Sequence, residues 1–287
     1  MLTSLKPFFT LVLIPALTVA ASATITWTTI DYPGASNTMV LGMNNRGDLV
    51  GCFACPGLAV HGFLFSNGIF TVVDFPGAKS TVAEGINDFG DIVGTYQLSD
   101  SDPTPRGFFL HNHVVESIRL PGWGSTSLHG INNNGDLVGD SLSNQAQFGF
   151  VRKGSVYYRF IFPLSVYTYA RAINNAGDIA GYYTGGDLNA PAHGFVLRLG
   201  KSKRWKIIDA PGSETHINAV NDRRQLAGQV RQGLTLRGFA LSYHDLMILR
   251  RTETDFVTAT GMDNQANLVG YYYDTVNFRF HGFIRTR

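Results

Sequence analysis

A repeated phrase in the sequence is preceded by a different residue in each of its copies, and four of these residues are strongly polar. The phrase resembles GINNxGDLVG, and its six copies start at Gly42, Gly85, Gly130, Ala172, Ala219 and Gly261. The residues immediately before these copies are Leu41, Glu84, His129, Arg171, Asn218 and Thr260. In one shared cavity, Glu84 could act as general acid or base with His129 assisting, while Arg171 holds an anionic group. The competing interpretation is a solvated channel that contains paired charges and water.

No sequence motif assigns a reaction to these side chains. The chain has no GxSxG nucleophile elbow, no HExxH zinc motif, no P-loop and no dinucleotide-binding glycine cluster. These absences do not exclude an enzyme, because a protein built of repeats can assemble its site from separate repeats. The channel candidates are therefore Glu84, His129, Arg171 and Asn218, and no catalytic role is assigned among them.

The two cysteines, Cys52 and Cys55, lie in the string CFACPG. In an oxidising compartment this spacing favours a local disulfide. A redox-active CxxC usually sits at a helix N-terminus, whereas this pair follows a predicted strand and precedes Pro56 and Gly57. A zinc site would need two further ligands. We expect the disulfide and no metal.

Two adjacent Asx residues open a turn in every copy of the phrase. The pairs are Asn44–Asn45, Asn87–Asp88, Asn132–Asn133, Asn174–Asn175, Asn221–Asp222 and Asp263–Asn264. Asx oxygens suit calcium, but an EF-hand loop is longer and needs several acidic positions plus a Glu. Side-chain capping of the turn's own backbone is the favoured interpretation.

A second recurring string, His-Gly-Phe or Arg-Gly-Phe, marks another strand. Its copies are centred on Gly62, Gly107, Gly194, Gly238 and Gly282, with Phe148-Gly149-Phe150 in the remaining repeat. The Phe is expected in the core. The His or Arg is interpreted as structural, because a catalytic residue is rarely needed in several repeats.

Aromatic residues near variable loops are candidate ligand-binding groups. They are Trp123, Tyr96, Tyr182, Tyr183, Tyr271 and Tyr272. Aromatic rings beside polar groups offer stacking platforms for sugars or anchors for a protein partner. Some of these tyrosines are instead expected to pack between neighbouring sheets.

These residues must be positioned by short strands. In one repeat, residues 69–75, 81–86, 91–96 and 107–110 read as strands, separated by a Pro-Gly turn, an Asx turn and a variable loop. The last repeat lacks an outer strand, and residues 25–32 supply one spare strand. The count predicts an all-β, six-bladed β-propeller of four-stranded antiparallel blades, closed by the N-terminal strand joining the last blade. An open β-solenoid is the alternative.

The combination of DxPG, GINxxGDIVG and His-Gly-Phe at intervals of 42 to 47 residues resembles the HAF-repeat family of probable extracellular bacterial proteins. The resemblance covers residues 25–287. It implies export and a repeat fold, and it brings no catalytic residues. The sequence departs from the family's His-Ala-Phe by carrying His-Gly-Phe or Arg-Gly-Phe.

Residues 1–23 read as a secretory signal peptide, with Lys6 before an apolar stretch and Ala21-Ser22-Ala23 at the cleavage site. Residues 24–287 are then one propeller domain, secreted or periplasmic. Without Lys6 the formal charge falls from +2 to +1, which gives no electrostatic footprint for nucleic acid. No later segment reads as a membrane span, and a monomer is expected.

The leading functional interpretation is an exported recognition module. It would bind a glycan or a protein partner at the channel mouth and the loop face, without a cofactor. The alternative is an extracellular polysaccharide hydrolase or lyase with an active site in the axial channel.

Overall fold

A computed structural model describes residues 24–57, 59–120, 122, 124–143, 146–186, 190–199, 204–243, 245–252 and 256–286. Within these ranges the only regular elements are β-strands, numbered β1 to β24. The proposed signal peptide, residues 1–23, lies outside the described residues. No helix in the described part of the chain has the length and apolarity of a membrane span.

Four sheets each contain four antiparallel strands. One sheet is β2 (Thr38–Met43), β3 (Leu49–Phe53), β4 (His61–Ser66) and β5 (Ile69–Val72). Another is β6 (Ser80–Ile86), β7 (Ile92–Gln97), β8 (Arg106–His111) and β9 (Val114–Ile118). A third is β18 (Glu214–Val220), β19 (Leu226–Gln232), β20 (Thr235–Ser242) and β21 (Asp245–Ile248). The fourth is β1 (Thr26–Ile30), β24 (Arg279–Thr286), β23 (Leu268–Asp274) and β22 (Phe256–Met262).

The fifth sheet has eight strands and consists of two antiparallel halves. The first half is β10 (Ser127–Ile131), β11 (Leu137–Ser143), β12 (Ala146–Lys153) and β13 (Val156–Phe160). The second half is β14 (Tyr167–Ile173), β15 (Asp178–Thr184), β16 (Ala192–Arg198) and β17 (Arg204–Ile208). A single parallel pair, Gln147 with Tyr167, joins β12 to β14.

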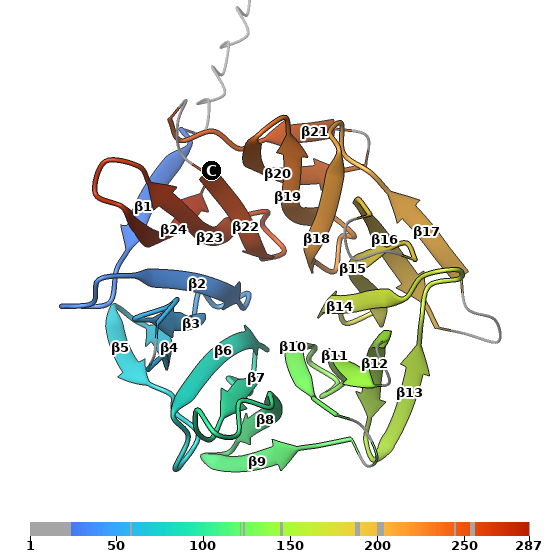
Figure 1. The fold of residues 1–287 in the computed structure, drawn as a ribbon. Helices are drawn as coiled ribbons and strands as arrows, with labels where there is room; N and C mark the ends of the chain where they lie inside the picture. The colour runs from blue at the N-terminus through green and yellow to red at the C-terminus, as the bar shows by residue number, and fades with distance from the viewer. Residues whose placement is uncertain are drawn as a thin grey trace, which may run out of the picture.

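The sheets stand side by side around a central axis, with β2, β6, β10, β14, β18 and β22 nearest to it (Figure 1). The ring is closed by strands from opposite ends of the sequence. Strand β1 pairs antiparallel with β24, from Thr26 opposite Thr286 to Ile30 opposite Gly282. The N-terminal strand therefore joins the last sheet, as the strand count predicts.

A buried phenylalanine lies at the centre of each antiparallel set of four strands. These residues are Phe63, Phe108, Phe150, Phe195, Phe239 and Phe283, none more than 1% exposed. The glycine that closes the repeated phrase packs beneath such a ring. A Cβ on Gly94 would lie 2.7 Å from the Phe108 ring and 2.0 Å from the carbonyl oxygen of Val82. A side chain at this position would therefore collide with both the ring and the neighbouring backbone.

The His-Gly-Phe string has a structural role in three repeats. His61 Nδ1 lies 2.7 Å from Asp74 Oδ2, and His193 Nδ1 lies 2.9 Å from Asp209 Oδ2. His281 Nδ1 makes the same contact with Asp31. Each aspartate begins a DxPG turn, so the two recurring motifs hold one another within one set of four strands.

The Asx turns perform two tasks. Within one turn, Asn87 Oδ1 accepts hydrogen bonds from the backbone N–H groups of Phe89 (3.0 Å) and Asp91 (2.9 Å), as side-chain capping predicts. The second Asx of each turn also accepts the backbone N–H of its counterpart in the preceding turn. These bonds of 2.7 to 2.9 Å form a closed circle, here called the Asx belt, through Asn45, Asp88, Asn133, Asn175, Asp222 and Asn264.

Candidate functional site

A β-bulge places the polar column of the sequence on the channel wall. In each innermost strand, the pairing register shifts at the residue immediately before the repeated phrase. The residues at these shifts are Leu41, Glu84, His129, Arg171, Asn218 and Thr260. Because a bulge redirects a side chain out of the regular pleat, the same backbone irregularity presents six different side chains to one space.

That space is a pocket of about 250 Å³ at the axis. All four predicted channel candidates, Glu84, His129, Arg171 and Asn218, line it. The structure therefore brings together side chains that are separated by 134 residues in the sequence, from Glu84 to Asn218 (218 − 84 = 134).

Two carboxylates hold the His129 ring. Its Nδ1 lies 2.5 Å from Glu84 Oε2, and its Nε2 lies 2.7 Å from Asp140 Oδ2. The hydroxyl of Thr95 donates to the other Glu84 oxygen at 3.2 Å. The side chains of His129, Glu84 and Asp140 are 8%, 13% and 6% exposed. A histidine whose two nitrogens both face carboxylates is suited to carry both protons.

The charge state of the cluster follows from this arrangement. Burial and the nearby Arg171 disfavour a charged ring, but Glu84 and Asp140 outweigh them and raise the pKa of His129 to about 9. Burial would raise the pKa of Glu84, yet His129 and Arg171 hold that pKa below its usual value. At neutral pH the site therefore contains an imidazolium and an ionised carboxylate. The ring can donate a proton and has no free nitrogen to accept one.

A neutral aromatic wall adjoins this ionic cluster. The Tyr182 ring stacks between Tyr169, with ring centroids 4.6 Å apart, and His216, at 4.0 Å. Gln229 supports the wall, since its Nε2 lies 3.2 Å from His216 Nδ1 and its Oε1 accepts from Thr258 at 2.9 Å. Burial lowers the pKa of His216 to about 4 and raises the pKa of Tyr182 to about 12. Both groups are therefore uncharged at neutral pH.

Some of the predicted aromatic residues line the pocket, and others are buried in the core. Tyr182 and Tyr271 line the pocket. Tyr183 stacks on Phe162 with centroids 3.6 Å apart. The expectation of a ligand-facing role for Tyr96 and Tyr272 requires correction, because they are only 4% and 3% exposed.

The burial of these two tyrosines has a local cause. Tyr96 stacks on Phe75 and its hydroxyl lies 2.8 Å from Ser117 Oγ, while Tyr272 stacks on His281. Their rings fill the space between strands. Trp123 lies outside the described residues.

Sequence reasoning missed three important side chains of the site, Asp140, His216 and Gln229. Asp140 and Gln229 directly follow the glycine that closes the phrase, as do Tyr182 and Tyr271. In the register, Gln229 lies opposite His216 and Tyr182 lies opposite Tyr169. Side chains alternate between the two faces of a strand, so the residue after each buried glycine points to the other face. Applied to the sequence, this rule would have directed the residues after the closing glycines toward the channel.

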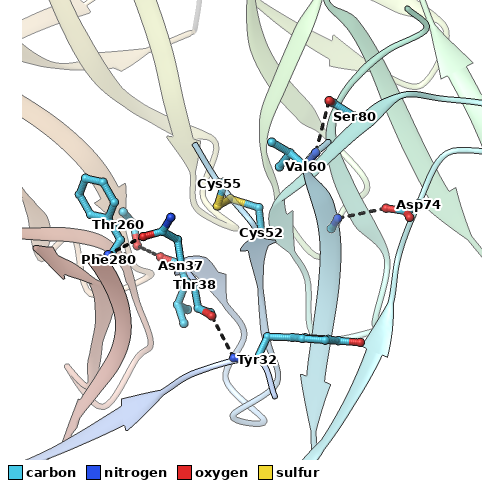
Figure 2. The surroundings of a disulfide bond; sticks show 12 residues. Tyr32, Asn37, Thr38, Cys52, Cys55, Val60, Asp74, Ser80, Thr260 and Phe280 are labelled. Atoms are coloured by element: carbon cyan, nitrogen blue, oxygen red, sulfur yellow. Dashed lines mark hydrogen bonds between the residues drawn. A yellow bond between two sulfur atoms is a disulfide. The ribbon is translucent and has the colours of Figure 1, made fainter. Parts of the chain in front are cut away.

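Cys52 and Cys55 form a disulfide at the end of strand β3 (Figure 2). The two cysteines pack with Val60, and Leu41 and Met39 are among the residues that contact this cluster. Leu41 also lines the pocket. The disulfide therefore fixes a segment next to the pocket. Among the described residues, no group of three or more His, Cys, Asp or Glu side chains is arranged to hold a metal ion.

No family model matches the chain, and no curated protein matches it. Solved structures do. TolB from Acinetobacter baumannii superposes with a TM-score of 0.55 at 14% identity, over 89% of this chain and 65% of the TolB chain. The chain thus spans about two thirds of that protein's length.

Two further solved structures resemble the chain. An arginine-to-alanine mutant of AofleA from Arthrobotrys oligospora gives a TM-score of 0.55 at 12% identity, over 92% of this chain and 87% of that one. A mutant of Aleuria aurantia lectin in complex with Fucα1-6GlcNAc gives 0.50 at 10%, over 88% and 95%. Such low identities show the fold alone: the chain is an all-β protein of the β-propeller class, with a polar pocket at its axis.

Proposed function

We propose that this protein is a recognition module that binds a glycan in the axial pocket. The observation that carries the proposal is the composition of the pocket wall. Tyr182 and Tyr271 offer aromatic rings, and Asn218 and Gln229 offer amides. Sugar recognition uses this combination of ring faces for C–H surfaces and amides for hydroxyl groups.

The ionic cluster supports binding over turnover. His129 and Glu84 are engaged with one another, so neither is free to serve as a general base. Aleuria aurantia lectin, solved with Fucα1-6GlcNAc, has the same fold, so a propeller of this kind accommodates a glycan.

The number of blades, the export of the chain, its oligomeric state and its family are also part of this proposal. We propose six blades, with the two halves of the eight-stranded sheet counted as separate blades because one residue pair joins them. We also propose that the chain is an exported, monomeric member of the HAF-repeat family, with residues 1–23 removed as a signal peptide. Release of a protein beginning near Thr24 into the medium or periplasm of an expressing bacterium would test export.

A glycan-retention screen with product release assayed in the same wells tests the function. We expect retention of at least one glycan without new products. Tyr182→Ala should weaken retention at least 10-fold, because it removes a ring face from the pocket. The matched control is Tyr158→Ala on the outer strand β13, where the side chain is 49% exposed. Equal retention by both variants would contradict a binding site at the axis.

A hydrolase or lyase is the second candidate. The observation that favours it is the contact of His129 with two carboxylates, which leaves a charged ring able to protonate a leaving group. Products in the screen that disappear with Glu84→Gln would establish this alternative and displace the recognition module.

A further inference from the structure

The guanidinium of Arg171 is the charged group of the pocket that a ligand would meet. Its side chain is 28% exposed, against 13% for Glu84 and 8% for His129. Asp140 is 6% exposed and lies behind the His129 ring. The carboxylates are therefore directed at His129, and the accessible charge is positive.

The hydrogen-bond donors of Arg171 lack good acceptors within the protein. Nη1 lies 3.0 and 3.2 Å from the two nitrogens of His129. Both nitrogens already face carboxylates, so a doubly protonated ring offers Arg171 no lone pair. Among the described residues, the carboxylate within ion-pair distance of this guanidinium is that of Glu84, whose Oε2 lies 3.5 Å from Nη2, and Asp140 acts on Arg171 from farther away. The Arg171 guanidinium thus lies against the His129 imidazolium, and some N–H groups of Arg171 remain available to a ligand.

An anionic acceptor on the exposed side of Arg171 would accept hydrogen bonds from the N–H groups that His129 and Glu84 leave unused. A carboxylate matches the planar fork of a guanidinium and forms two parallel hydrogen bonds with it. The volume of about 250 Å³ lies below the roughly 300–1,000 Å³ typical of drug-sized ligands, and suits a short saccharide end.

We propose that the axial pocket recognises a carboxylated saccharide, with Arg171 binding the carboxylate of a uronic acid. Tyr182 and Tyr271 then flank the sugar ring, and Asn218 lies beside it on the pocket wall. This inference rests on the proposed glycan-binding function and narrows it to acidic sugars. It does not require a chemical step.

The test is a calorimetric titration with oligosaccharides of galacturonate, glucuronate and mannuronate, each beside its carboxyl-reduced counterpart and a panel of neutral glycans. We expect at least one acidic oligosaccharide to bind at least 10-fold more tightly than its reduced counterpart. Arg171→Gln should abolish that preference, and Arg171→Lys should restore part of it. Arg204→Gln, on the outer strand β17, should behave as the unaltered protein.

The outcomes separate the two proposals. Equal affinity for acidic and reduced forms, or neutral glycans bound with no acidic one, would overturn the role of Arg171 and leave glycan binding standing. Failure of every glycan to bind would overturn both. The comparison of acidic and reduced ligands uses the unaltered protein, so it remains decisive even if Arg171→Gln does not fold.

Discussion

At the scale of single residues, the pocket contains two histidines that differ in charge: the His129 ring is protonated at neutral pH and the His216 ring is not. His129 lies between two carboxylates, which outweigh burial and raise its pKa to about 9. In the described part of the chain no carboxylate is hydrogen-bonded to His216, which stacks on a neutral Tyr182 ring, so burial dominates and lowers its pKa to about 4. The surroundings, and not the residue type, determine which histidine carries charge.

The protonation of these rings can be measured by NMR titration. At pH 7, we expect His129 to show the shifts of a doubly protonated ring and His216 those of a neutral one. Glu84→Gln should lower the pKa of His129, because it removes one of the two carboxylates. Titration of both rings near pH 6.5 would contradict the ionic cluster.

The raised pKa of His129 also predicts the pH dependence of stability. The stabilisation is complete below the unfolded pKa of 6.5 and is lost as pH rises through about 9. The free energy of unfolding should therefore fall by on the order of 3 kcal/mol between pH 6.5 and 10 because of this residue. Urea denaturation across this range measures it, and His129→Gln should show a flatter profile. Parallel profiles for the two proteins would argue against the assignment.

At the scale of elements, the sequence predicted the strands and turns better than the site. The repeated phrase located the Asx turns and the strands on either side of them, because period-two patterns and Asx-Gly turn chemistry are local. It did not reveal that Glu84 and Arg171 sit at β-bulges, since a bulge is defined by the register with a partner strand. Asp140 was missed for a related reason, because its role depends on its contact with His129 of the neighbouring strand.

A second set of hydrogen bonds links neighbouring Asx turns, and it is interrupted between the last turn and the first. The first Asn of each of five turns donates from its side chain to the carbonyl of the next turn, as Asn87 Nδ2 does to Asn132 O at 3.3 Å. In the last turn Asp263 replaces this asparagine and has no N–H to donate. The two residue types are exchanged in this turn. Asn267 occupies the position that is an aspartate in turns such as Asn87–Asp91, and its side chain donates to Asp263 Oδ2 at 2.7 Å.

Exchanging this pair should complete the second set of contacts. The double substitution Asp263→Asn with Asn267→Asp restores the Asn–Asp arrangement of the first four turns and adds a donor toward Asn44. We expect the free energy of unfolding to rise by about 0.5–1.5 kcal/mol, the usual net value of one hydrogen bond. Urea denaturation measures the gain. Asp263→Asn alone is the control and should give none, so an equal gain from it would refute this explanation.

At the scale of the whole molecule, ring closure was predictable from a count of strands. The last repeat lacks an outer strand and the first is preceded by a spare one, and β1 indeed pairs with β24. Hydrophobic contacts reinforce this seam, because Trp27 packs against Phe283 with ring centroids 4.8 Å apart and Ile30 is buried. The ligand could not be predicted in this way, since a propeller fold is compatible with many functions.

Deleting β1 should open the ring. The deletion removes five backbone pairings and exposes the apolar surface covered by Trp27 and Ile30, worth roughly 1.5–3 kcal/mol for each side chain that is fully buried. We expect a lower melting temperature in calorimetry, and partial recovery when a peptide of residues 24–33 is added. An unchanged melting temperature would show that the seam contributes nothing.

The central claim is that a saccharide binds at the axis, beside Arg171 and Tyr182. The most direct measurement is a crystal structure of the protein grown with the best-retained glycan. We predict sugar density in the axial pocket, with a carboxylate against the Arg171 guanidinium and a ring face on Tyr182 or Tyr271. Density on the outer strands or loops, with the axial pocket free of sugar, would contradict the claim.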